Sequence, residues 1–228
     1  MSHFDRLRSR LSEVRGGAGH LPSLRLPGVP TLEQRHVEGA ILCADRFEML
    51  KHITLGPDPV IAEVGVAYGE FSRALIDRFR PREFHAFDIF TMHTLASAWG
   101  RDPREVFQGK THAEFYRDRF AADAGVKIFE GDSSTELSRH PDALYDLIYV
   151  DGAHDYQGVK RDAHVAVKKL TQNGVLVFND YIMFDHIAGV PYGVVQVVND
   201  LCANHGWRMT HFALQNVMFC DVALMRAV

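Results

Sequence analysis

The sequence predicts a single α/β domain built on a doubly wound, mostly parallel seven-stranded sheet that ends in an antiparallel hairpin. Three observations lead to this fold class. Short apolar runs alternate with amphipathic stretches, the apolar runs lack a polar–apolar alternation, and polar residues follow one run after another. Strands covered by helices on both faces have this unbroken apolar character. Strands that alternate with helices favour parallel pairing with right-handed crossovers.

The elements follow in chain order. Residues 31–53 begin with Thr31, a residue suited to an N-cap, and repeat apolar side chains at the helical spacing, so a leading helix is expected. We expect strands at 59–66, 83–90, 126–133, 145–153 and 172–181, and helices at 69–79, 155–170 and 191–205, with a helix stop at Asn173 and Gly174. Residues 207–214 and 216–228 flank a Gln-Asn turn and form the expected terminal hairpin.

The domain organisation is simple. Residues 1–30 are expected to form an N-terminal arm, because residues 16–30 are rich in Gly and Pro. Such an arm can wrap around a neighbouring subunit, so assembly into a homo-oligomer is one alternative for this protein. Residues 31–228 then form one domain with a mostly helical insertion at about 91–124.

Composition narrows the class of partner. The chain has 228 residues, 46% of them hydrophobic and 24% charged, and its net charge of -4 provides no basic surface for nucleic acid or an anionic membrane. A small-molecule partner is therefore expected. The first residues hold no apolar segment of a secretory signal, and no stretch reaches the roughly 18–20 apolar residues of a membrane span. With three cysteines in no paired pattern, the sequence predicts a cytoplasmic protein.

Polar and glycine residues mark the ends of the first three expected strands. Gly65 and Gly69 surround the first turn, where glycines let a backbone pass close to a ligand and the next helix points free N–H groups. Their spacing is G-x-x-x-G, so the dinucleotide fingerprint G-x-G-x-x-G is absent. Asp88 follows the second strand, where a carboxylate can accept from a ribose diol. Each signal alone also fits a turn or cap, but their recurrence favours a nucleoside ligand.

These stretches resemble the class I S-adenosylmethionine-dependent methyltransferases, over roughly residues 58–228. The similar segments are "EVGVAYG", "AFDIF" and "EGDSS". The resemblance implies a Rossmann-like sheet and S-adenosylmethionine as cofactor. It implies cofactor contacts for Glu63, Gly65 and Gly69 at the methionine part, Tyr68 and Ser72 at the carboxylate, Asp88 at the ribose, Asp132 and Ser133 at the adenine, and Asp151 alongside.

The fourth and fifth strands end in oxygen-bearing side chains. Asp151 ends one strand, and Asn179 and Asp180 end the next. In neighbouring strands about 4.8 Å apart, these groups would converge and suit Mg²⁺, with waters and substrate oxygens completing its shell. The alternative is that Asp151 caps the following helix and Asn179 with Asp180 makes a turn.

His154 stands three residues beyond Asp151, where an imidazole with a pKa of about 6.5 can take a proton from a bound hydroxyl. The stretches "DGAHDY" and "FND" resemble the metal-dependent small-molecule O-methyltransferases, including the macrolide-sugar enzymes and, more distantly, catechol O-methyltransferase. The catechol enzymes place lysine where His154 stands and have the order "DN". Asp155 is expected to cap the next helix.

The sequence therefore predicts Mg²⁺-assisted O-methylation of a small molecule such as a sugar, polyketide or diol, with His154 as general base. Residues 91–124 and 181–193 are expected to wall the acceptor, although their aromatic side chains fit core packing equally well. Three alternatives stay open: a metal-free methyltransferase, an NAD-type oxidoreductase on a similar sheet, and a noncatalytic binding protein. A further resemblance, to the cephalosporin hydroxylase-like branch, leaves the acceptor reaction open.

Overall fold

The computed structural model describes residues 28–227. Residues 1–27 of the expected N-terminal arm, together with the subunit contact considered for it, lie outside this range. Within residues 28–227, no helix combines the length and the apolar character needed to cross a membrane.

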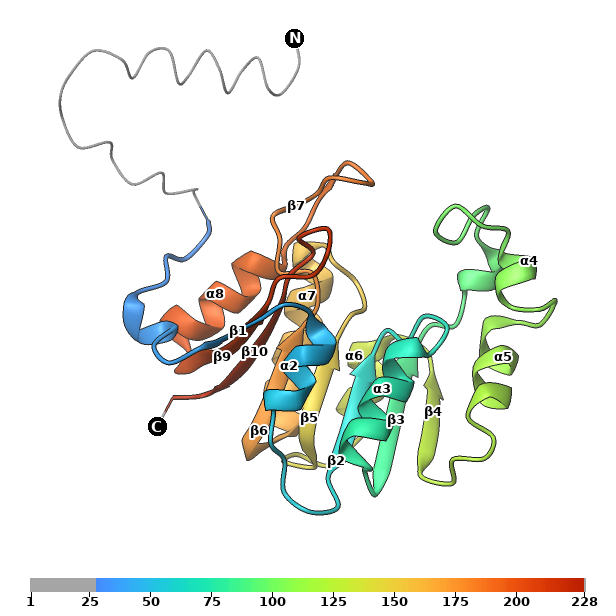
Figure 1. Ribbon diagram of the computed structural model, residues 1–228, viewed down its shortest axis with the longest axis horizontal. Coiled ribbons are helices and arrows are strands. Elements are labelled where there is room, and N and C mark those ends of the chain that lie inside the picture. The colour runs from blue at the N-terminus through green and yellow to red at the C-terminus, as the bar shows by residue number, and fades with distance from the viewer. Residues whose placement is uncertain (1–27, 228) are drawn as a thin grey trace, which may run out of the picture.

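An eight-stranded, mostly parallel sheet forms the centre of the domain, in the order β1-β9-β10-β6-β5-β2-β3-β4 (Figure 1). The central strands are β2 (Val60–Val64), β3 (Glu83–Asp88), β4 (Val126–Glu130), β5 (Tyr145–Val150) and β6 (Leu170–Phe178). The hairpin strands β9 (Trp207–Ala213) and β10 (Asp221–Arg226) are antiparallel to each other, and β10 is antiparallel to β6. The expected α/β architecture and terminal hairpin are confirmed, but the sheet has one strand more than the predicted seven.

The additional strand comes from the segment expected to be a leading helix. Residues 31–53 instead form η1 (Gln34–His36), β1 (Ile41–Cys43) and α2 (Arg46–His52). Gly39, with φ of 73°, turns the chain after η1, and β1 then pairs in parallel with β9. Asp45 caps α2 by accepting from the Glu48 N–H at 2.8 Å. The single-helix prediction was wrong because edge pairing with β9, a partner far along the chain, outweighed the local periodicity.

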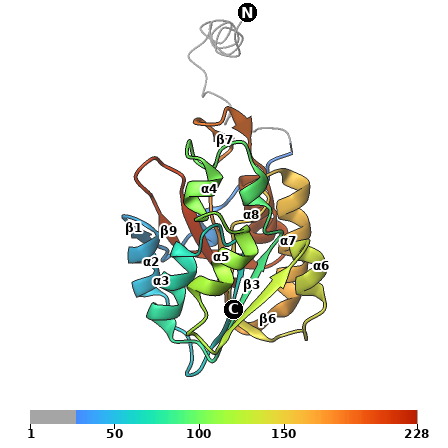
Figure 2. The same cartoon turned by 90° about the vertical axis from the view of Figure 1, so that its right-hand side faces the viewer.

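Helices cover the two faces of the sheet, as Figure 2 shows with the sheet edge-on. One face carries α2, α3 (Glu70–Phe79) and α5 (His112–Arg119), and the other carries α6 (Ser133–Ser138), α7 (Tyr156–Lys169) and α8 (Val194–Asn204). Each face has its own apolar cluster. Leu75 and Phe84 belong to the first, whereas Val159 and Leu176 belong to the second. The strands between these clusters have no polar face, which explains their unbroken apolar runs.

Two further segments rise beyond the carboxyl ends of the parallel strands (Figure 1). The first follows β3 and contains η2 (Met92–Thr94) and α4 (Pro103–Val106), in the region expected to be a helical insertion, before the chain returns to the sheet as α5. The second follows β6 and contains the short hairpin β7 (Phe184–Asp185) and β8 (Val190–Pro191). The helix stop expected at Asn173 and Gly174 was placed too late, because α7 ends at Lys169 and Leu170 already pairs with Tyr145.

Candidate functional site

The carboxyl ends of β2, β3, β5 and β6 surround a cavity of about 690 Å³. Most of the site residues expected from the sequence line it: Glu63, Gly65, Tyr68, Asp88, Asp132, Ser133, Asp151, His154, Asn179 and Asp180. The structure therefore brings together side chains that lie more than 100 positions apart in the sequence. A cavity of this size can hold a nucleoside-sized ligand together with a small acceptor.

Gly65 lies where the ends of β2 and β5 approach each other. Its φ is 79°, and a Cβ built on it would lie 2.0 Å from the Asp151 carbonyl oxygen. The Asp151 N–H donates to the Val64 carbonyl at 2.7 Å, which holds the two strand ends together. We expected this glycine to make room for a ligand. The structure shows that it makes room for the backbone that carries Asp151.

Gly69 and Ser72 do not line the cavity, which corrects their expected places beside the cofactor. A Cβ on Gly69 would lie 2.7 Å from the Phe120 ring, so this glycine is required by packing. Ser72 is fully buried, donates its hydroxyl hydrogen bond to Glu63 and accepts one from Tyr116 at 2.8 Å. Ser72 thus supports Glu63 from behind and has no exposed hydroxyl for a cofactor carboxylate.

Glu63 is the buried carboxyl of the first strand. Burial raises the pKa of Glu63 to about 8, against the opposing effect of the hydrogen bond from Ser72. Nearby carboxylates, among them Asp151, raise it further, and Arg46 lowers it. Since a cation would favour the ionised form, a positively charged ligand in the cavity would release a proton from Glu63.

Asp88 closes the turn after β2. Its two carboxylate oxygens accept from the Val66 N–H at 2.9 Å and from the Phe90 N–H at 2.6 Å. Each oxygen keeps a second lone pair for another donor. The carboxylate is therefore fixed at the cavity wall by main-chain contacts, in a place where it can accept from a ligand's hydroxyls.

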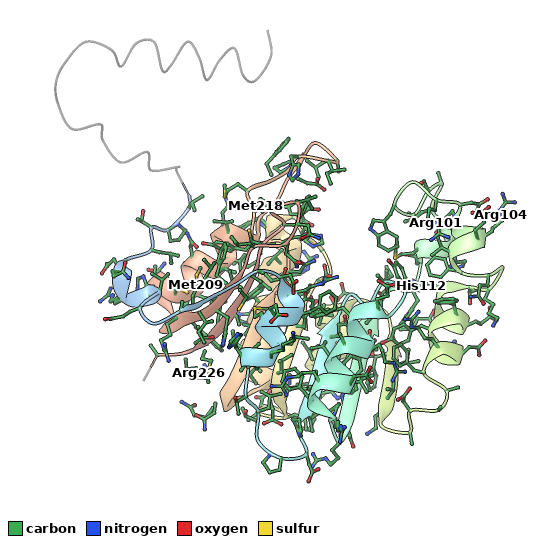
Figure 3. All side chains as sticks on the ribbon, viewed as in Figure 1. Arg101, Arg104, His112, Met209, Met218 and Arg226 are labelled. Atoms are coloured by element: carbon green, nitrogen blue, oxygen red, sulfur yellow. The ribbon has the colours of Figure 1, made fainter. Side chains whose placement is uncertain are left out.

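His112 anchors the α5 segment to this turn. Figure 3 shows it between the sheet and the segment that carries Arg101 and Arg104. It is fully buried between Phe90 and Phe107, and its Nε2 hydrogen-bonds to the Ala67 carbonyl. Burial lowers the pKa of His112, so the neutral ring is the favoured form. Its role is to hold the turn that borders the cavity.

Asp132 and Ser133 begin α6. Asp132 caps this helix by accepting from the Thr135 N–H at 2.9 Å, and its hydrogen bonds to Ser134 and Thr135 lower the pKa of Asp132. The Ser133 hydroxyl donates to Asp162 at 2.7 Å. Both residues still line the cavity, so the cap and a contact with a ligand are compatible at this position.

Asp151, Asn179 and Asp180 meet where β5 and β6 end side by side. The Asn179 amide donates to Asp151 Oδ1 at 2.7 Å. His154 Nε2 lies 3.4 Å from the same oxygen and 3.5 Å from Asp180 Oδ2. Burial and the charge of Asp151 raise the pKa of Asp180 to about 6. The neighbouring strands therefore bring these four side chains together, as the sequence predicted.

His154 is held in place by a flat ring stack. The Tyr192 ring is stacked on it with a centroid distance of 4.6 Å and an angle of 13° between the planes, and the Tyr192 hydroxyl donates to Asp185 at 3.0 Å. Burial alone would lower the pKa of His154, but the neighbouring carboxylates of Asp151 and Asp180 outweigh it and raise the pKa.

Asp155 is the N-cap of α7, as expected. Its side chain accepts from the N–H groups of Gln157 at 3.0 Å and Gly158 at 3.1 Å. Since the helix begins directly after the loop that carries His154, this cap fixes the point at which the chain leaves the site.

Arg46 and Tyr192 lie in the cavity wall but were not among the site residues expected from the sequence. Arg46 was hidden inside the expected leading helix, whereas it stands at the start of α2. Tyr192 falls in the segment 181–193 expected to wall the acceptor, but no local pattern distinguished this tyrosine from its neighbours. Met92 and Trp99, in the other expected segment 91–124, also line the cavity. Tyr68 packs edge-on against Trp99 at 5.2 Å.

The donor chemistry of the Asp151 group fits a hard divalent cation. Two carboxylates and one amide converge, and His154 Nε2 is buried without a hydrogen-bond partner among the described residues. Within residues 28–227, no three His, Cys, Asp or Glu side chains are arranged to hold a metal ion on their own. Mg²⁺ needs no such cage, since one or two protein carboxylates with waters and substrate oxygens suffice.

Comparison with known proteins identifies the architecture. The family model described as a methyltransferase domain matches residues 62–181. No curated protein matches the sequence. Among solved structures, a protein from Corynebacterium glutamicum matches with a TM-score of 0.57 and 12% identity, over 100% of this chain and 98% of that one.

Two further structures carry functional names. A candidate caffeoyl-CoA O-methyltransferase from Staphylococcus aureus has a TM-score of 0.54 and 14% identity, over 100% of this chain and 93% of that one. A SAM-dependent methyltransferase from Aquifex aeolicus has a TM-score of 0.53 and 13% identity, over 80% of this chain and 90% of that one. At these identities the likeness concerns the fold.

Proposed function

The chain belongs to the methyltransferase domain family, and from that premise we propose that it methylates a hydroxyl oxygen of a small molecule, with Mg²⁺ assistance and His154 as general base. Family membership makes the protein an S-adenosylmethionine-dependent methyltransferase. It also sets aside the NAD-type oxidoreductase and the noncatalytic binding protein. The oxygen acceptor, the metal and the base are the proposal.

One observation carries the proposal. His154 Nε2, buried and without a hydrogen-bond partner among the described residues, lies within 3.5 Å of carboxylates from two neighbouring strand ends. A proton-accepting nitrogen beside two carboxylates, at the rim of a cofactor-sized cavity, suits proton removal from a hydroxyl. A tyrosine ring stacked on the imidazole limits its rotation.

In the proposed reaction, His154 Nε2 takes the hydroxyl proton while the oxygen attacks the sulfonium methyl. The C–O bond forms, the C–S bond breaks, and S-adenosylhomocysteine leaves. The carboxylates of Asp151 and Asp180 stabilise the resulting imidazolium. A divalent cation held by Asp151, Asp180 and the Asn179 oxygen would lower the pKa of the acceptor hydroxyl. Asp88, Asp132 and Ser133 are proposed to hold the nucleoside.

The test couples cofactor binding to turnover. Calorimetry with S-adenosylhomocysteine, with and without Mg²⁺, establishes the binding of both. Turnover is then followed as S-adenosylhomocysteine release with a panel of catechols, sugars and other vicinal diols. We expect EDTA to abolish turnover and Mg²⁺ to restore it, and His154→Gln to lower kcat by about 10²- to 10⁴-fold.

His164→Gln is the matched control, because His164 is an exposed histidine on α7, outside the cavity. It should retain the kcat of the unmodified protein. If His154→Gln turns over as fast as His164→Gln on an accepted substrate, His154 is not the base.

A metal-free methyltransferase is the second candidate, and one contact favours it. The Asn179 amide N–H already satisfies Asp151 Oδ1, so Asp151 is held without an ion. Full turnover after EDTA treatment would select this candidate and remove the metal from the mechanism.

A further inference from the structure

Arg46 is a cation in a cavity rimmed by carboxylates. It starts α2 and reaches the cavity wall, where the acidic lining residues are Glu63, Glu70, Asp88, Asp132, Asp151 and Asp180. Among the described residues that line the cavity, Arg46 is the one arginine or lysine. A positive charge at this place needs an explanation that the proposed proton transfer does not give.

The contacts of Arg46 hold its guanidinium without using most of its donors. The guanidinium carbon lies 4.4 Å from the centroid of the Phe71 ring, which supports the group from one side. Nη1 donates to the Tyr149 hydroxyl at 3.3 Å and lies 4.0 Å from Asp151 Oδ2, a long ion pair. A guanidinium has five N–H donors. The group is thus oriented by protein contacts yet retains donors for a ligand.

The position of Arg46 indicates which part of a ligand it meets. His154 lies beside Oδ1 of Asp151, whereas Arg46 lies beside Oδ2. Phe71, which supports Arg46, is in the first turn of α3, directly after the Gly65–Gly69 turn. Arg46 therefore borders the cavity between α3 and the end of β5, whereas His154 borders it from the loop between β5 and α7, beside Asp180.

We infer that Arg46 binds the carboxylate of the methionine part of S-adenosylmethionine. This inference rests on the proposed cofactor site. Of the two residues expected at that carboxylate, Ser72 is buried behind Glu63 and cannot reach it, and Tyr68, which lines the cavity, carries no charge. An arginine pairs with a carboxylate through two parallel N–H···O bonds, which a single hydroxyl cannot offer. Arg46 also offsets the negative charge of the surrounding carboxylates, so that an anionic group can enter.

The test uses two cofactors that differ in one group. Calorimetry measures the Kd of S-adenosylmethionine and of decarboxylated S-adenosylmethionine for the unmodified protein, Arg46→Gln, Arg46→Lys and the control Arg82→Gln. Arg82 is an exposed arginine directly before the amino end of β3, whereas the cavity lies at the carboxyl ends of the strands. We expect Arg46→Gln to raise the Kd of S-adenosylmethionine by roughly 10- to 100-fold. Arg46→Lys should raise it by less, because lysine keeps the positive charge but lacks the two parallel N–H donors of the guanidinium. Decarboxylated S-adenosylmethionine should bind both variants within about twofold of the unmodified protein.

Equal weakening of the two cofactors would overturn the inference, because Arg46 would then act only through Tyr149 and Asp151. Unchanged binding of S-adenosylmethionine by Arg46→Gln would overturn it as well. Failure of the proposed cofactor site itself is a different result, since the unmodified protein and Arg82→Gln would then bind neither cofactor.

Discussion

Replacement of Gly65 by alanine should damage both the fold and the site. The new Cβ would lie 2.0 Å from the Asp151 carbonyl oxygen, 2.5 Å from its carbonyl carbon and 2.9 Å from the Gly152 Cα. These are main-chain atoms, so no side-chain rotation can relieve the contact. The left-handed φ of 79° adds its own strain for any residue with a Cβ.

The magnitude follows from a matched glycine. Gly206 has φ of 71° and nothing within 4 Å of the place that a Cβ would take, so Gly206→Ala suffers only the left-handed strain, about 1–2 kcal/mol. Gly65→Ala adds an overpacking cost of about 1–3 kcal/mol or more. We expect Gly65→Ala to lose about 2–5 kcal/mol of unfolding free energy, with a fall in Tm of about 2–4 °C per kcal/mol.

The assay is urea unfolding of both variants, followed by calorimetric titration with S-adenosylhomocysteine. The ends of β2 and β5 must separate to make room for the alanine side chain, which displaces Asp151. Gly65→Ala should therefore also weaken the binding of S-adenosylhomocysteine, whereas Gly206→Ala should bind it with normal affinity. Equal losses of unfolding free energy in the two variants would refute the reasoning, since the contact with the end of β5 would then cost nothing.

Three further changes test other parts of the site. Since the pKa of Glu63 is raised to about 8, the folded protein holds a proton that the unfolded chain releases above pH 4.5; this contribution to stability is lost as pH rises toward 8. The unfolding free energy of Glu63→Gln, relative to that of the unmodified protein, should rise by up to about 1.4 kcal/mol per pH unit in that window. Parallel pH profiles of the two proteins would contradict this. Tyr192→Leu removes the ring stacked on His154 and should lower kcat by about 2- to 10-fold, while Tyr192→Phe, which keeps the ring, should cost less; equal kcat values for the two would argue against the stack. Asp155→Ala should cost about 1 kcal/mol of unfolding free energy through the lost cap and leave cofactor affinity unchanged, so a large fall in affinity would indicate a direct role.

Much of the site could be located from the chain alone. Parallel strands end at one edge of a sheet, so a polar residue after each apolar run had to lie there, and Asp88, Asp151 and Asp180 do. The cap at Asp155 was equally local, because it depends on the two or three N–H groups that follow.

Long-range contacts decided what could not be foreseen. Ser72 and Gly69 occupy motif positions that suggest a ligand. Ser72 instead hydrogen-bonds to Glu63 and Tyr116, and Gly69 packs against the Phe120 ring. His112 became an anchor because the fold carried it to the Ala67 carbonyl, 45 positions earlier in the chain. None of these partners is marked by a local pattern.

The sequence by itself determined the α/β class, the terminal hairpin and the edge of the sheet at which the chemistry lies, because burial on two faces and strand direction are recorded in local hydrophobic patterns. Only the tertiary structure decided that residues 41–43 join the sheet, that Gly65 gives way to the backbone of Asp151, and that Arg46 faces the carboxylates of the cavity. Each of these depends on a partner distant along the chain, and the free energy of such a contact exists only once the fold has brought both sides together.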